Sequence, residues 1–251
     1  MHQNLANATF QVIAGNKCGS GFSFLRDDIV VTNCHVVMPL LDVANKKTLG
    51  PAILVTESGQ RLQAQIKKVD INDDFAVMQL SESLPAGRVV LQPATDFIPT
   101  RGMRLIFAGY PHGYEELLTS EAILSAPLDA GKFAIDGMVN GGNSGGPIID
   151  AESGLVIGLI TRRRYPGGEK AEQLQEEASQ LRAYLEQASQ NMSVAIMGVD
   201  FGELADMFGR SLQVITELMN HNANPGIGIG YPISPVTEAA KQQQRAFITK
   251  F

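Results

Sequence analysis

The sequence has little positive charge, few cysteines and no long apolar run. Its 251 residues include 20 Lys and Arg against 26 Asp and Glu, which gives a net charge of −6. An acidic chain disfavours a nucleic-acid-binding role, for which a basic face is expected. No stretch reaches the roughly 18 to 20 apolar residues of a membrane span. We therefore expect neither a nucleic-acid partner nor a membrane span.

The two cysteines, Cys18 and Cys34, are too few for a disulfide framework. The N-terminus lacks a basic start followed by an apolar core, so no signal peptide is visible. We therefore expect a cytoplasmic protein with reduced thiols, unless the chain is a processed form of an exported protein.

Short apolar segments alternate with turn residues over most of the chain. A first group of strands is predicted at residues 9–13, 19–25, 29–33, 52–56, 62–69 and 75–80. A second group is predicted at 103–107, 121–125, 132–135, 147–149, 155–160 and 226–233. Many short strands at this spacing indicate a barrel or a sandwich. We expect one β unit at residues 1–90 and a second at 91–168, completed by a strand within 223–251.

The character changes to helical at residues 169–222, which we interpret as an insertion. From Glu169 to Met192 apolar residues recur every three or four positions, which predicts a helix with a narrow apolar seam. A second helix is predicted from Asp200, where Glu203 completes a pattern like a capping box. A terminal helix is predicted from Ser234. The insertion either packs on its own barrel or pairs through its seam with another copy or a partner protein.

One serine, Ser144, lies between glycines in the segment 140–147 (NGGNSGGP), directly before an apolar strand. Glycines adopt positive φ readily, so the backbone can bend sharply, display the hydroxyl and bring N–H groups together. Acyl transfer needs such a nucleophile beside a hole for an oxyanion. Taken alone, the pattern also fits an ordinary turn.

Two further residues lie in contexts that suit an acid–base role. His35 follows a predicted strand and Asp74 directly precedes another. Each has an ordinary interpretation as well: His35 as a surface or core histidine, and Asp74 as a turn residue. The chain order His35, Asp74, Ser144 is that of the two-barrel serine proteases. Together the three contexts predict a catalytic triad.

The blocks 31–37 (VTNCHVV), 74–80 (DFAVMQL) and 142–147 (GNSGGP) resemble the triad blocks of trypsin-like serine proteases. They look most similar to the HtrA-type branch, as do 19–22 (GSGF) and 228–233 (GIGYPI). The resemblance covers roughly residues 9–165 and 226–248. It implies a mostly β fold, a trypsin-like double six-stranded β-barrel, here with an α-helical insertion and a C-terminal helix. No PDZ domain, which this branch often carries, is expected in this sequence.

The resemblance also implies a serine endopeptidase that needs no metal or organic cofactor and acts on polypeptides through an acyl-enzyme. Ser144 would be the nucleophile, His35 the general base and then acid, and Asp74 would fix the imidazole tautomer. The backbone N–H groups of Gly142 and Ser144 would form the oxyanion hole. Two alternatives stay open: a catalytically silent or latent binding or scaffold protein on this fold, and an esterase that uses the same triad.

The sequence departs from the trypsin pattern at Asn143 and at Cys34. Asn143 replaces the Asp that pairs with a newly cut N-terminus in digestive enzymes, so activation by N-terminal cleavage is not expected. Cys18 matches a trypsin disulfide partner, but Cys34 precedes His35 instead of following it, so the usual bridge is not expected. We predict an inert buried thiol for each cysteine. Cys34 as a nucleophile is disfavoured, because the glycine-rich turn belongs to Ser144.

By the same resemblance, Met138 would form the floor of the primary specificity pocket, and Thr161, Arg162 and Arg163 its wall. A methionine floor offers no charge to a basic side chain, which favours small or medium apolar residues at P1. Arg163 stands where a glycine is usual, so it either narrows the pocket or favours an acidic neighbour.

Overall fold

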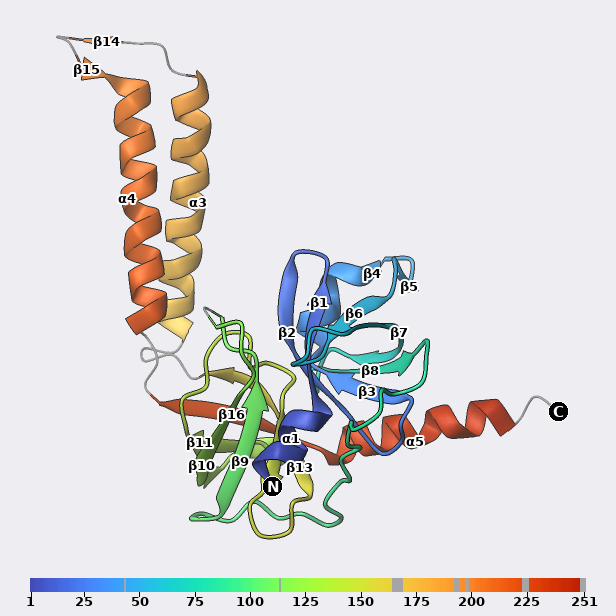
Figure 1. Cartoon of the computed structure of the whole chain (residues 1–251). Coiled ribbons are helices and arrows are strands. Elements are labelled where there is room, and N and C mark those ends of the chain that lie inside the picture. The colour runs from blue at the N-terminus through green and yellow to red at the C-terminus, as the bar shows by residue number, and fades with distance from the viewer. Residues whose placement is uncertain are drawn as a thin grey trace. The chain divides into compact units, whose positions relative to one another are not determined.

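Two closed six-stranded barrels dominate the computed structural model (Figure 1). The structure describes residues 1–42, 44–112, 114–163, 169–191, 195–196, 199–222 and 226–248. The first barrel contains β1 (Thr9–Ala14), β2 (Lys17–Ser23), β3 (Ile29–Thr32), β8 (Phe75–Leu80), β7 (Arg61–Asp70) and β6 (Ala52–Val55), in that order around the barrel. The second contains β10 (Leu118–Pro127), β11 (Phe133–Asp136), β16 (Ile227–Pro232), β13 (Val156–Arg163), β12 (Pro147–Asp150) and β9 (Arg104–Gly109). The predicted fold class is confirmed.

Strand β3 shows why some barrel strands are continuous runs of β-branched residues in the sequence. Val30 belongs to the core inside the first barrel, whereas Ile29 and Val31 belong to a core shared by both barrels. Successive strand residues point to opposite faces, so a strand with a core on each side buries every residue, as β3 does.

The shared core lies where the two barrels and two helices meet. Leu5 of α1 (His2–Ala8) and Val236 of α5 (Ser234–Ile248) both reach it, and α5 packs against β8. The core also contains Phe22 and Phe24, whose rings meet edge to face at 5.7 Å between centroids. Each fully buried side chain of this size contributes about 1.5–3 kcal/mol. This core therefore holds the two barrels together.

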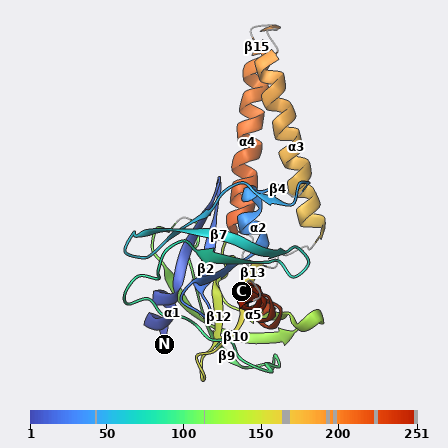
Figure 2. The same cartoon turned by 90° about the vertical axis from the view of Figure 1, so that its right-hand side faces the viewer.

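Residues 164–225 form a second compact unit, which is a helical hairpin. Helices α3 (Glu169–Asn191) and α4 (Phe201–Asn222) lie side by side and antiparallel (Figures 1 and 2). In the chain segment that connects the two helices, β14 (Ala195–Ile196) pairs with β15 (Val199–Asp200). The Asp200 carboxylate accepts the N–H groups of Gly202 and Glu203, which caps α4 at the predicted position. None of the described helices is long and apolar enough to cross a membrane.

The structure adds short elements that the sequence patterns did not predict. They are α1, α2 (Cys34–Val37), η1 (Met38–Leu40), β4 (Leu41–Asp42), β5 (Lys47–Thr48), η2 (Asp129–Gly131), β14 and β15. The position of His35 is corrected by one of them: it lies in the helical turn α2 that follows β3, not on the end of the strand itself. Four residues are too few for a helical period to be visible in sequence.

The two strands that flank the hairpin in the sequence, β13 and β16, are neighbours in the second barrel. Arg163 of β13 is the register partner of Gly228 of β16, and antiparallel partners lie about 5 Å apart. We predict that replacing residues 164–225 by a short Gly/Ser turn leaves a cooperative thermal transition within about 4 °C of the full chain. Loss of cooperative unfolding in circular dichroism would show that the barrels need the hairpin.

Candidate active site

His35 and Asp74 are joined by two hydrogen bonds. One carboxylate oxygen of Asp74 lies 2.8 Å from His35 Nδ1, and the other accepts the His35 backbone N–H at 3.0 Å. The Asp74 side chain is 13 % exposed and the His35 side chain 42 %. A carboxylate at Nδ1 favours the tautomer with its proton there, which leaves Nε2 as a proton acceptor.

The first barrel brings these two residues together by strand pairing. β3 and β8 are neighbours, with Thr32 opposite Ala76, so the segment after β3 meets the segment before β8. Asp74 has φ +47°, a left-handed conformation that Asp tolerates better than most residues. This turn directs its carboxylate to His35.

Asn33 ties this pair to the second barrel. Its amide nitrogen donates to the Asp74 backbone carbonyl at 2.7 Å and to the Thr161 hydroxyl at 3.2 Å. Asn33 is fully buried, so these bonds form away from solvent competition. The sequence patterns did not single it out as a site residue, although it lies in the same block as His35.

Ser144 lies in a turn before β12 that only glycine can form at two positions. Gly142 has φ +94° and Gly145 has φ +84°. A Cβ at Gly142 would collide with the Tyr110 carbonyl oxygen, and one at Gly145 with the Ser20 carbonyl oxygen. Both the backbone conformation and the close packing therefore require glycine.

In this turn the carbonyl groups have more hydrogen-bond partners than the N–H groups. All four carbonyls from 141 to 144 have protein donors: His112 N to Gly141 O (2.6 Å), Ser20 Oγ to Gly142 O (2.8 Å), Gly146 N to Asn143 O (2.9 Å) and Ser20 N to Ser144 O (2.8 Å). The N–H groups of Gly142 and Ser144 have no acceptor among the described residues. Two unpaired N–H groups in fixed peptide planes can bind an oxyanion.

The Ser144 hydroxyl points to β13 in this structure. Its Oγ donates to the Thr161 carbonyl at 3.1 Å, and no hydrogen bond joins it to His35 in the described part of the chain. The structure thus brings His35 and Asp74 into direct contact and pairs Ser144 with Thr161 instead. Catalytic hydrogen bonds are often long in unliganded sites and tighten only when substrate binds.

The four residues predicted for the specificity pocket differ in their surroundings. Met138 follows β11 and is 63 % exposed, whereas Thr161 is buried beside Ser144. Arg162 and Arg163 belong to β13, where they pair with Ile229 and Gly228 of β16. Their side chains lie outside the described residues. The roles of all four in binding P1 stay predictions.

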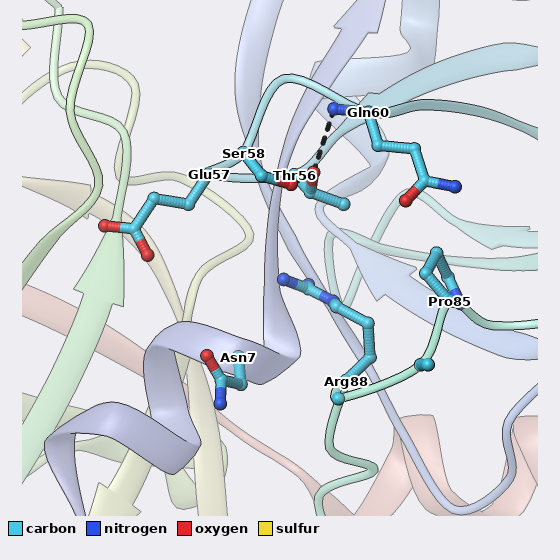
Figure 3. Close-up of a pocket in the computed structure, with 9 residues that line it drawn as sticks. Asn7, Thr56, Glu57, Ser58, Gln60, Pro85 and Arg88 are labelled. Atoms are coloured by element: carbon cyan, nitrogen blue, oxygen red, sulfur yellow. Dashed lines mark hydrogen bonds between the residues drawn. The ribbon is translucent and has the colours of Figure 1, made fainter.

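A separate polar pocket of about 330 Å³ lies in the first barrel (Figure 3). It is lined by Asn7, Thr56, Glu57, Ser58, Gln60, Pro85, Ala86, Gly87 and Arg88. Arg88 donates to the Thr9 carbonyl at 2.6 Å and lies 4.0 Å above the Phe10 ring, and burial lowers its pKa to about 10. None of the predicted site residues lines this pocket.

The two cysteines are both free thiols but differ in exposure. Cys34 is buried as predicted, and burial raises its pKa to about 11. The prediction of a buried thiol was wrong for Cys18, which is exposed. β2 buries its residues only from Gly19 onward, so the strand begins outside the packed part of the barrel.

The comparisons with known proteins agree with this architecture. Residues 19–159, more than half of the chain, match the family described as trypsin-like peptidase domain. The chain belongs to that family.

Its relatives belong to the HtrA branch, which confirms the resemblance seen in the sequence. "Serine protease HTRA1B" of Danio rerio is 30% identical over 154 residues, covering 57% of this chain and 30% of that protein. "Probable periplasmic serine endoprotease DegP-like" of Brucella suis is 34% identical over 158 residues, covering 60% of this chain and 28% of that protein. The chain thus spans less than a third of the length of these relatives.

Solved structures share the fold. The HtrA-type protease AlgW with a tripeptide aligns with a TM-score of 0.61 at 18% identity, covering 96% of this chain and 62% of that one. A serine endoprotease from Yersinia pestis aligns with a TM-score of 0.53 at 21% identity, covering 65% and 58%. At these identities the likeness shows the fold alone.

We predict that iodoacetamide modifies Cys18 and spares Cys34 in the folded protein at pH 8. The thiolate is the reactive form, and Cys34 with a pKa of about 11 stays a buried thiol at that pH. Intact mass should show one adduct under native conditions and two in urea. Two adducts on the folded protein would contradict the burial of Cys34.

Substitution Gly142→Ala should destabilise the protein more than Gly102→Ala. Both glycines have positive φ, at +94° and +86°, but a Cβ at Gly102 meets no atom within 4 Å. The two variants share the conformational cost, so their difference reports the collision with Tyr110, about 1–3 kcal/mol of unfolding free energy. Equal losses in denaturant unfolding would mean that the turn can move aside.

Proposed function

We propose that this protein is a serine endopeptidase that uses His35, Asp74 and Ser144. The main support is the pair of hydrogen bonds between His35 and Asp74, together with a turn in which the N–H groups of Gly142 and Ser144 have no acceptor among the described residues. Membership of the trypsin-like peptidase domain family supports the same activity.

In the proposed reaction Ser144 Oγ attacks the carbonyl carbon of a peptide bond while His35 Nε2 accepts the hydroxyl proton. The carbonyl oxygen becomes an oxyanion between the N–H groups of Gly142 and Ser144. The C–N bond then breaks, and the amine leaves with the proton from His35. Water hydrolyses the resulting ester by the same steps, with His35 again as base. The Asp74 carboxylate stabilises the imidazolium in each half.

Before attack the Ser144 side chain must rotate away from the Thr161 carbonyl. This exchanges one hydrogen bond, with a net value of about 1 kcal/mol, for a bond to His35. Such a cost is small beside the binding energy of a peptide substrate. A silent binding protein on this fold is the rival proposal, and the orientation of Ser144 is the observation that favours it.

For the substrate we propose polypeptides with a small or medium apolar residue at P1. The uncharged Met138, predicted to line the pocket, supports this preference. Peptides that differ only at P1 test it, and best turnover with Lys or Arg at P1 would contradict it. The cytoplasmic location stays a prediction from the sequence.

The hairpin supports a further proposal, association with a second copy of the chain. Several large apolar side chains on its two helices are about half or more exposed: Leu181, Tyr184, Met207, Phe208, Val214 and Ile215. Burying such side chains against another chain is favourable. Light scattering across a concentration range, with and without residues 164–225, distinguishes this from a hairpin that has no partner.

A fluorophosphonate should form a single covalent adduct with the wild-type protein at Ser144. The adduct should be absent in Ser144→Ala. In His35→Ala and Asp74→Asn it should form at least about 10²-fold more slowly, because the base is lost or its tautomer changes. Intact mass over time measures the rates, and Ser153→Ala, which changes an exposed serine outside the site, serves as the control.

Two outcomes would contradict the proposal. No adduct on the folded wild type would leave Ser144 without activation and favour the silent binding protein. An adduct that persists in Ser144→Ala would place the reactive nucleophile elsewhere.

A further inference from the structure

We propose that Ser20 is a positioning residue: by holding the carbonyls of Gly142 and Ser144, it fixes the conformation of the turn whose Gly142 and Ser144 N–H groups the reaction uses. This rests on the proposed function. Ser20 lies in β2 of the first barrel and is fully buried. It was not predicted as a site residue, and it has no part in proton transfer.

Every polar group of Ser20 is engaged, and two of its bonds go to the turn that carries Ser144. Its Oγ donates to the Gly142 carbonyl at 2.8 Å and accepts the Tyr110 N–H at 2.9 Å. Its backbone N–H donates to the Ser144 carbonyl at 2.8 Å. Its carbonyl accepts the Thr32 hydroxyl at 2.7 Å. A serine hydroxyl that donates one bond and accepts another has a defined orientation.

These bonds act on the peptide planes around Gly142. His112 N holds the carbonyl of the 141–142 peptide, and Ser20 Oγ holds that of the 142–143 peptide. The Gly142 N–H belongs to the first of these planes, so His112 holds its direction, and Ser20 fixes the next plane and thereby the conformation of Gly142 between the two. Glycine has the largest range of φ and ψ angles, so the peptide planes on its two sides can rotate easily. The turn therefore depends on hydrogen bonds from residues outside it to keep a single conformation.

Ser20 also joins the two halves of the proposed triad. Thr32, which donates to the Ser20 carbonyl, lies three residues before His35 on the first barrel. Tyr110, Gly142 and Ser144 belong to the second barrel. One buried residue thus connects the segment of the base with the segment of the nucleophile.

The glycines on either side of Ser20 explain how β2 can come close to the turn that carries Ser144. A Cβ at Gly19 would lie 2.7 Å from a Val36 methyl group and 3.1 Å from the Ser144 carbonyl oxygen. A Cβ at Gly21 would lie 2.8 Å from the Val31 carbonyl oxygen. The GSGF segment therefore combines two positions without side chains and one short hydroxyl between them.

The test compares Ser20→Ala with Ser23→Ala. Ser23 lies on the same strand, is equally buried, and its hydroxyl donates to the Ala8 and Val89 carbonyls rather than to the turn. Both variants lose a buried hydroxyl that donates to backbone carbonyls, and the free energy of unfolding measures how far their losses of stability differ. The measurements are the rate of fluorophosphonate labelling, kcat and KM for a peptide substrate, and the free energy of unfolding.

We expect Ser20→Ala to lower kcat and the labelling rate at least about 10²-fold with little change in KM, because oxyanion binding acts in the transition state. Ser23→Ala should stay within about threefold of the wild type. Equal rates in the two variants would overturn the proposal and leave Ser20 a merely structural residue. A wild type that does not react at all would refute the proposed function itself, and the inference with it.

If Ser20→Ala does not fold, the same comparison is made between Ser20→Cys and Ser23→Cys. A thiol fills nearly the same space but is a weak donor and acceptor. Ser20→Cys should still react at least about tenfold more slowly than Ser23→Cys. Equal rates in this pair would overturn the proposal in the same way.

Discussion

The backbone contact between β2 and the Ser144 turn is the constraint on which the site depends. At this contact the Ser20 backbone N–H donates to the Ser144 carbonyl, and the Ser20 hydroxyl donates to the Gly142 carbonyl. Such an approach is possible only where side chains are missing, which is why glycines lie on both sides of it. The contact turns a flexible glycine-rich segment into one with defined peptide planes, and only defined planes can offer preorganised donors.

A second set of contacts places His35 relative to this turn. The carboxylate of Asp74 binds His35 at both its backbone N–H and its ring, and Asn33 holds the backbone of Asp74 against Thr161 of the second barrel. Because the Thr161 carbonyl also accepts the Ser144 hydroxyl, Asn33 and Ser144 share Thr161 as a neighbour. The shared apolar core behind them keeps the barrels in place, so these short polar contacts do not have to carry the stability of the interface.

The sequence was informative where function is encoded locally. The strand pattern and the three blocks around His35, Asp74 and Ser144 were enough to predict the double barrel and the candidate triad. Ser20 and Asn33 were missed as site residues because their roles depend on partners far along the chain. Ser20 meets Gly142 across 122 positions and Asn33 meets Thr161 across 128. Barrel closure creates these contacts, and no periodicity reveals them. Cys18 was misjudged because strand patterns do not show where a strand leaves the packed wall.

The central claim is that Ser144 makes this chain a peptide-bond hydrolase. The most direct measurement is the digestion of an unfolded polypeptide by the purified protein beside its Ser144→Ala variant, with the products identified by mass. We expect internal cleavage by the wild type and none by the variant at equal folded concentration. Equal cleavage by both proteins, or no cleavage by either, would contradict it.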